Sequence, residues 1–371
     1  MIKYRLENYE EALNHQVIHM DQAVCYCPEF RAVRMMHHYP SRRLQLARAV
    51  WKGEMELSDY IGEINFAGIL SRQGERWQNF RECPEDCTDV TILSRQMLLE
   101  KGYISPEVQA FQKALEEGKG RPDASVKWEL PTDKDSKMGI LLDDETAHCR
   151  KENEVDFNAY CQARGISFAN GAESEFLGFE YFACGLVEEG IAHLEKLIEK
   201  YEKTGIEKLL VLSAKAAYLL GRFPEKWERK PSFEIVYLPE MLEPVKETEK
   251  TYVYGGSFNL RYLGNSELLN KLVPAASEEQ IPTSQEFTPL LKGDARVNKL
   301  TIWQKPVGAE YRLFCPNQEM TEAIRKDACR DIETSQAEKI LVFEPAAYAV
   351  LKKMFPKKKV VYYLQEAVQS L

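Results

Sequence analysis

The chain has 371 residues and a mass of 42.8 kDa, a length that accommodates two or three domains of about 150 residues each. Hydrophobic residues make up 44% of it and charged residues 29%, a balance that excludes a disordered protein. The formal net charge is -9. Because affinity for nucleic acids comes from cationic side chains placed on phosphates, we expect no nucleic-acid partner.

The first 120 residues are predicted to be helical. Four helices are expected, over residues 42–51, from Ser58 onward, and over residues 90–102 and 106–117. The first of them places Leu44, Ala47 and Trp51 on one face, and Ser58 is a suitable N-cap for the second. No strand pattern precedes residue 135. We therefore predict an all-helical domain over residues 1–120.

Glycine, proline and charged residues crowd together over residues 121–136, which predicts a linker. Beyond it, short apolar runs cover residues 138–142, 209–212, 233–238, 251–254, 340–343 and 360–364. Helical patterns, the longest of them over 186–204 and 318–335, separate these runs. This alternation predicts βαβ crossovers and therefore an α/β fold with mostly parallel sheets.

The second part of the chain repeats itself. Residues 207–220 (EKLLVLSAKAAYLL) correspond, with a one-residue slip, to residues 338–351 (EKILVFEPAAYAVL), and each copy is followed by a strand and a short helix. Such self-similarity is the signature of a duplicated unit. We predict two α/β repeats, over residues 137–250 and 251–371.

The compartment follows from three features. The longest apolar stretch, residues 209–220, contains a lysine and is shorter than the ~20 residues of a membrane span. Acidic residues stand in the first twelve positions, where a secretory signal would be apolar. Nine cysteines without such a signal indicate free thiols in a reducing compartment. We expect a cytoplasmic protein without a membrane span.

Several short segments of the repeats carry a family resemblance. Residues 181–185 and 313–316 stand where the family has Cys-Cys-Gly, and residues 213–218 and 343–348 where it has Cys-Pro-x-Cys-Tyr. With residues 253–262, they resemble the duplicated cysteine-rich domain of the heterodisulfide reductase catalytic subunit. The iron–sulfur subunits of anaerobic glycerol-3-phosphate dehydrogenase and glycolate oxidase share this domain.

The N-terminal part resembles the helical ferredoxin module of the same family, over residues 27–58. The resemblance therefore implies an all-helical, degenerate ferredoxin-like domain followed by a tandem-repeat α/β domain. It also implies an oxidoreductase that carries iron–sulfur clusters.

Most of the cluster ligands that the resemblance implies are missing. Four thiols remain at family positions: Cys27, Cys83, Cys184 and Cys315. The other positions hold Val17, Met20, Ala23, Gln73, Arg76, Asn79, Ala183, Ala214, Ala217, Ser257, Phe314, Glu344 and Ala347. Because a single thiolate does not hold a cluster, we expect no iron–sulfur cluster, metal or other cofactor. Most replacements are small or apolar, so we expect them to refill the former sites.

Two functions are compatible with these losses. The first is a non-catalytic structural or regulatory subunit of a redox complex, with a protein partner such as an intact relative or a flavoprotein. The alternative is a thiol-based or small-ligand-binding oxidoreductase in the cleft between the repeats. The vestigial pocket would then include Cys184, Cys315, Ser257, Glu344, Tyr218 and Tyr348. A third hypothesis, clusters completed by cysteines of another chain, ranks last.

Five further features have a structural interpretation. A zinc site from Cys25, Cys27, Cys83, Cys87, His15 and His19 is disfavoured by the cysteine spacings. Cys184 and Cys315 are expected as buried apolar residues rather than a redox pair. The acidic run 143–145 predicts a solvated helix start, and residues 37–38 a helix end before Pro40. Arg261 is expected to hold its loop.

Overall fold

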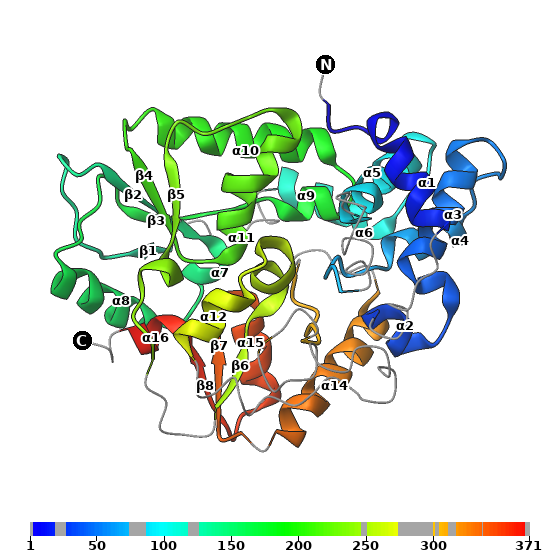
Figure 1. The fold of residues 1–371 in the computed structure, drawn as a ribbon. Coiled ribbons are helices and arrows are strands. Elements are labelled where there is room, and N and C mark those ends of the chain that lie inside the picture. Colours follow the sequence, from blue (N-terminus) through cyan, green and yellow to red (C-terminus); the bar gives the residue numbers. More distant parts are fainter. Residues whose placement is uncertain are drawn as a thin grey trace.

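The computed structural model describes residues 3–18, 27–73, 87–117, 126–245, 251–273, 300, 304–310, 317–335 and 337–367. Within them the chain has a mixed α/β fold with two sheets, and helices of the N-terminal part lie beside both (Figure 1). Of the residues discussed above, the following lie outside the described part: His19, Met20, Ala23, Cys25, Arg76, Asn79, Cys83, Phe314 and Cys315.

The N-terminal part is helical, as predicted. Its elements are η1 (Leu6–Tyr9), α1 (Glu10–Ile18), α2 (Pro28–Val33), η3 (Met36–His38), α3 (Pro40–Trp51), α4 (Asp59–Phe66), α5 (Cys87–Glu100) and α6 (Pro106–Glu116). Helix α3 buries Leu44 and Ala47 on the predicted face. The Ser58 hydroxyl caps α4 by accepting a hydrogen bond from the Ile61 amide at 3.4 Å. The 3₁₀-helix η3 ends two residues before Pro40.

The first sheet has the strand order β1-β3-β2-β4-β5, and all of its neighbours are parallel except the antiparallel pair β1–β3. The strands are β1 (Lys127–Trp128), β2 (Met138–Asp143), β3 (Ala172–Glu175), β4 (Lys208–Val211) and β5 (Glu234–Tyr237). The helices between and after them are α7 (Asp144–Ala147), α8 (Lys151–Arg164), α9 (Phe179–Ala183), α10 (Val187–Glu202), α11 (Ala214–Ala217), η5 (Tyr218–Arg222), η6 (Phe223–Trp227) and η7 (Leu238–Met241).

Strand β1 corrects two predictions, because it precedes residue 135 and lies inside the expected linker 121–136. Its two residues pair antiparallel with β3, so β1 forms an edge of the first sheet, and Trp128 is buried. A strand of this length is too short to produce an alternating pattern in the sequence.

The second sheet has the order β6-β7-β8, and all three strands are parallel. They are β6 (Thr251–Tyr254), β7 (Lys339–Val342) and β8 (Lys359–Tyr362). The accompanying helices are η8 (Phe258–Leu263), α12 (Ser266–Leu272), α14 (Gln318–Thr334), α15 (Pro345–Met354) and α16 (Tyr363–Ala367). All six predicted apolar runs thus form strands.

The two copies of the sequence repeat occupy the same place in their sheets. Strand β4 lies between β2 and β5, and β7 lies between β6 and β8. The short helices α11 and α15 follow β4 and β7 directly, and η7 and α16 follow β5 and β8. The order β2-β4-β5 therefore corresponds to β6-β7-β8.

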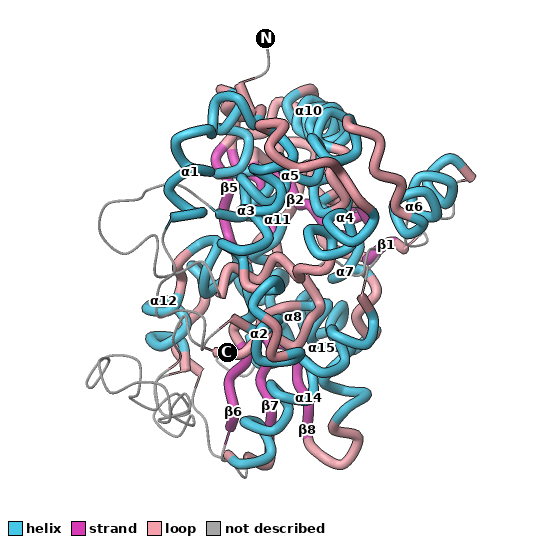
Figure 2. The backbone as a smooth tube through the Cα atoms, turned by 90° about the vertical axis from the view of Figure 1, so that its right-hand side faces the viewer, coloured by secondary structure: helices cyan, strands magenta, loops and turns pink. Residues whose placement is uncertain are grey.

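Two hydrophobic cores hold these layers together. Along β2 and β4, Leu141 and Leu209 belong to a core shared with the N-terminal helices, whereas Ile140 and Leu210 belong to a core shared with the second sheet. This is the two-residue alternation of a sheet that is covered on both faces. Figures 1 and 2 show one sheet above the other, with α7 between them. The carboxyl ends of β2 and β4 consequently lie inside the molecule.

Candidate functional site at the strand ends

Three neighbouring strands of the first sheet each lead into a short helix that carries a buried charge. Glu180 lies in α9 after β3, Glu145 in α7 after β2, and Lys215 in α11 after β4. Because β3, β2 and β4 are parallel neighbours, their carboxyl ends meet at one edge of the sheet. This edge is where α/β folds usually bind their ligands.

The three charged groups form an ion-paired cluster, which we call the Lys215 triad. The Lys215 Nζ atom lies 2.9 Å from Glu145 Oε1 and 3.1 Å from Glu180 Oε1, and all three side chains are only 2–3% exposed. Burial disfavours the ammonium charge, but the negative charges of Glu145 and Glu180 outweigh it and raise the pKa of Lys215.

Two capped helix starts orient this triad. The Asp143 carboxylate accepts hydrogen bonds from the Thr146 amide at 3.0 Å and the Thr146 hydroxyl at 2.8 Å, which fixes α7. The Ser213 hydroxyl accepts from the Ala216 amide at 3.2 Å and fixes α11. The positions of Glu145 and Lys215 are therefore set by local backbone geometry as well as by their mutual attraction.

The acidic run 143–145 begins a helix, as predicted, but the prediction that it is solvated is wrong. Asp143, Asp144 and Glu145 are 0–4% exposed. Their strand ends inside the molecule, where α7 contacts α15 of the second half. Burial, with the charges of Glu145 and Glu180, raises the pKa of Asp144 to about 8.

The second sheet holds a different polar cluster at the corresponding edge. Ser257 follows β6, and its amide donates to Glu344 Oε2 at 3.1 Å. Glu344 lies two residues after the end of β7. The Ser257 hydroxyl donates to Glu310 Oε1 at 2.5 Å and accepts from Arg261 Nη2 at 2.6 Å. Because arginine only donates, the single hydroxyl proton of Ser257 is directed at Glu310.

Glu344 packs closely against the loop after β6. At Gly256, where φ is +83°, a Cβ atom would lie 1.9 Å from Glu344 Oε2, so this position requires glycine. Burial, the negative charge of Glu310 and that of Glu145 raise the pKa of Glu344 to about 8. Burial also raises the pKa of Glu310. Helix α7, which carries Glu145, contacts α15, which begins directly after Glu344, so the two strand-end clusters lie near each other.

Arg261 holds its loop, as predicted. Its Nε atom donates to the Ser71 carbonyl at 2.5 Å, and its Nη1 atom donates to the Gln304 carbonyl at 3.0 Å. The same guanidinium that positions Ser257 thus also ties the segment after α4 to the second half.

Of the five predicted pocket residues that the structure describes, two are in direct contact, Ser257 and Glu344. Cys184 belongs to the first core, and its thiol donates to the Tyr181 carbonyl at 3.3 Å. Burial raises the pKa of this thiol to about 12. Cys184 is therefore a buried apolar residue, as predicted. The matching thiol, Cys315, lies outside the described residues.

The two predicted tyrosines lie in different cores. The Tyr218 hydroxyl accepts a hydrogen bond from Arg72 Nη2 at 3.2 Å and belongs to the first core. The Tyr348 hydroxyl accepts one from Lys352 Nζ at 2.9 Å and belongs to the second core. They do not form a common site.

The described residues at the family's ligand positions do not fit an iron–sulfur cluster. Ala183, Ala214, Ala217 and Ala347 are buried in the two cores and offer no electron pair to iron. In the helical part, Cys27 is buried and donates to Glu29 Oε2 at 3.1 Å, and burial raises its pKa. Among the described residues, no group of three or more His, Cys, Asp or Glu side chains is arranged to hold a metal ion.

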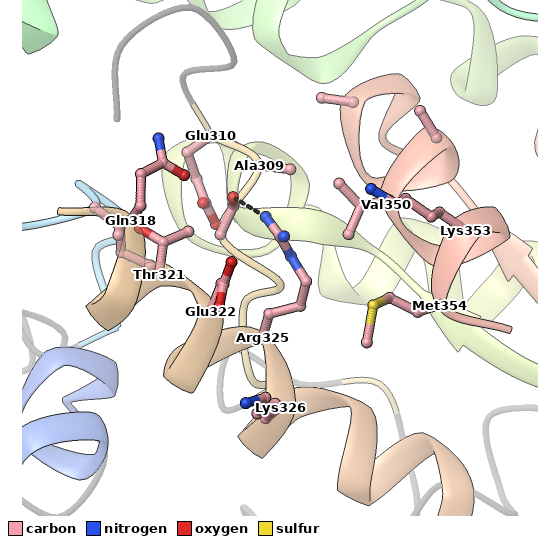
Figure 3. A pocket seen from close by; sticks show the side chains of 14 residues that line it. Ala309, Glu310, Gln318, Thr321, Glu322, Arg325, Lys326, Val350, Lys353 and Met354 are labelled. Atoms are coloured by element: carbon pink, nitrogen blue, oxygen red, sulfur yellow. Dashed lines mark hydrogen bonds between the residues drawn. The ribbon is translucent and has the colours of Figure 1, made fainter. Parts of the chain in front are cut away.

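A cavity of about 510 Å³ opens next to the Ser257 cluster, between α14 and α15 (Figure 3). Glu310 forms part of its wall, and none of the described residues of the predicted pocket does so. No sequence pattern distinguishes Glu310 or Glu180 from the other glutamates of the chain. Lys215 could have been singled out from the sequence, because it is the one charged residue in the apolar stretch 209–220.

Comparison of the chain with protein-family models, curated proteins and solved structures found no match. Within the described part of the chain, no helix is both long enough and apolar enough to cross a membrane.

Proposed function

We propose that this chain is a cluster-free relative of the iron–sulfur subunits that it resembles, and that it acts as a structural or regulatory component of a redox complex. Its partner in this proposal is an intact relative or a flavoprotein. The observation that supports the proposal is the Lys215 triad, which occupies the strand ends where the resemblance would otherwise require cluster ligands.

The chemistry of the triad favours this role over electron transfer. Carboxyl, ammonium and methyl groups carry no electrons at physiological potentials, and redox reactions in proteins depend on cofactors or reactive thiols. Thiol chemistry requires a thiolate, whereas Cys184 has a pKa of about 12 and is buried. These properties speak against the alternative, a thiol-based oxidoreductase that uses Cys184.

Metal analysis tests the first part of the proposal. The chain is purified anaerobically, and its iron and acid-labile sulfide are quantified before and after incubation with ferrous iron and sulfide. We expect iron well below one atom per chain and no absorbance band near 400 nm in either sample. Stoichiometric iron with that band would overturn the proposal.

Association tests the second part. The tagged chain is isolated under native conditions from the cell that produces it, and co-purifying proteins are identified by mass spectrometry. We expect a stoichiometric flavoprotein or iron–sulfur subunit. Isolation of the chain alone at every salt concentration would contradict a role as a subunit.

A further inference from the structure

The cavity is a groove between one face of α14 and one face of α15. Thr321, Glu322 and Arg325 face it from α14, and Ala346, Val350 and Lys353 face it from α15. Both sets have the three- and four-residue spacing of a single helix face. Its volume of about 510 Å³ is within the usual range of ~300–1,000 Å³ for small-molecule sites. Figure 3 shows the two helices on either side of the groove.

The buried part of the groove's lining, which we call its deep end, contains a carboxylate oxygen without a hydrogen-bond partner among the described residues. Glu310 is 2% exposed, and its Oε1 atom accepts the hydrogen bond from Ser257. Its Oε2 atom is buried and has no hydrogen-bond partner among the described residues. Leaving such an oxygen unpaired is costly, and a donor group of a bound molecule would remove this cost. The deep end therefore suits a hydrogen-bond donor, and above all an ammonium group.

The exposed part of the groove's lining, which forms its mouth, has the opposite charge. It contains Lys326 on α14 and Lys353 on α15, against the single carboxylate of Glu322. Arg325 is fixed in the wall, because its guanidinium donates to the carbonyl oxygens of Val307 at 3.2 Å and Gly308 at 3.4 Å. These cations favour a negatively charged group at the mouth.

The wall between the two ends is apolar, and its length is set by α15. Ala346, Ala349 and Val350 form this wall, and the two alanines leave room for a ligand. Glu310 is linked through Ser257 to Glu344, the residue that precedes α15, so the deep end lies at the start of this helix. From Ala346 to Lys353 the helix rises by about 10 Å at ~1.5 Å per residue.

We propose that this groove binds a small zwitterion, such as a short peptide with free termini, whose ammonium group bonds Glu310 and whose carboxylate lies at Lys353 and Lys326. An extended peptide covers about 3.3–3.6 Å per residue, so three residues span the required ~10 Å. A simple anion would be repelled by Glu310, and a simple amine would leave the cations at the mouth unpaired. This site does not depend on the proposed function, because it requires neither the absence of iron nor a protein partner.

The binding of trialanine and two blocked analogues tests the proposal. Isothermal titration calorimetry measures the affinity of the full chain for trialanine, N-acetyl-trialanine and trialanine amide. We expect trialanine to bind and each blocked analogue to bind at least tenfold more weakly. Absence of trialanine binding at millimolar concentrations, or equal affinity for all three peptides, would overturn the proposal.

Two variants assign the ends of the peptide. Glu310→Gln should weaken trialanine at least tenfold and should abolish the difference between trialanine and its acetylated form. Lys353→Gln, at the exposed end, should weaken trialanine but not its amide. Lys357→Gln, which removes an exposed charge in the turn after α15, is the matched control and should bind like wild type. If Lys353→Gln and Lys357→Gln have equal effects, the assignment of the carboxylate to Lys353 is wrong. A circular dichroism spectrum shows whether Glu310→Gln folds, and the Lys353 comparison tests the proposal independently.

Discussion

The Lys215 triad makes a strong prediction about stability. Replacing Lys215 by methionine keeps the length and apolar part of the side chain but removes the ammonium group between Glu145 and Glu180. Both buried carboxylates then lose the ammonium group that contacts them, and Asp144 loses the same nearby positive charge. We expect Lys215→Met to be among the most destabilising single substitutions in the α/β part.

The magnitude follows from the two contacts at 2.9 and 3.1 Å. With an effective dielectric constant of about 20, each attraction is worth ~5 kcal/mol, and the desolvation of the buried ions offsets a large part of this. Removing one partner from a buried ion pair costs about 3–5 kcal/mol in other proteins. We therefore expect a loss of about 3–5 kcal/mol in the free energy of unfolding at pH 7.

Urea unfolding followed by tryptophan fluorescence measures this loss. The matched control is Lys208→Met, because Lys208 lies on the same strand–helix unit and pairs with Glu234 at 3.5 Å on the surface. Exposed pairs contribute about 1 kcal/mol or less. Neutralising both carboxylates in the triple variant Lys215→Met, Glu145→Gln, Glu180→Gln should recover much of the loss. The reasoning is refuted if Lys215→Met lies within about 1 kcal/mol of Lys208→Met, or if the triple variant is less stable than the single one.

Three other predictions concern the interior. The pKa of Glu344 in the folded chain is about 8, above the ~4.3 of an unfolded glutamate. Between these values the folded state holds a proton that the unfolded state has released, so the free energy of unfolding decreases as the pH rises from about 4 to 8. The Glu344→Gln variant lacks this pH-dependent term, so its urea midpoint relative to that of the wild type should be higher at pH 8 than at pH 5. An equal difference between the two midpoints at both pH values would contradict this. Arg95 is fully buried and donates to the carbonyl oxygens of Asn65, Gly68 and Ala183. Arg95→Met should therefore lower the free energy of unfolding, measured in urea, by about 3 kcal/mol or more. A loss below about 1 kcal/mol would show that the stability of α5 does not depend on these bonds. Cys184 should resist iodoacetamide in the native chain and react only in urea, as peptide mapping can show, and rapid native labelling would contradict its burial and raised pKa.

The strands that were predictable are those whose residues are apolar on both faces. Residues 138–142 and 209–212 form continuous apolar runs because β2 and β4 are covered by a core on each side. Strand β3 gave no such signal, since its sequence is Ala-Glu-Ser-Glu and its inward residues are the small Ala172 and Ser174. Its place in the sheet is fixed by its neighbours β1 and β2.

The candidate site was less predictable because it depends on contacts between distant residues. Glu310 meets Ser257 across 53 positions, and Glu344 meets it across 87. The acidic run 143–145 predicts a helix start from local chemistry alone, and this was correct. Whether that start faces water depends on the placement of α15 over α7, which no local pattern encodes.

The two halves satisfy their strand ends by different chemistry, although their strand orders correspond. Counted from the equivalent strands β4 and β7, Glu344 corresponds to Ser213 and Ala346 to Lys215. The second copy therefore has a buried carboxyl group at the N-cap where the first has a hydroxyl group, and it lacks the buried cation of the first. The first half balances its carboxylates with an ammonium group, whereas the second relies on Ser257, Arg261 and a raised pKa. The expected refilling by small and apolar residues therefore describes the alanines of both copies but not Glu344. A buried carboxyl group retained without a matching cation is costly unless it is protonated or bonded to something else. This difference between the halves favours a ligand site beside the second sheet rather than beside the first.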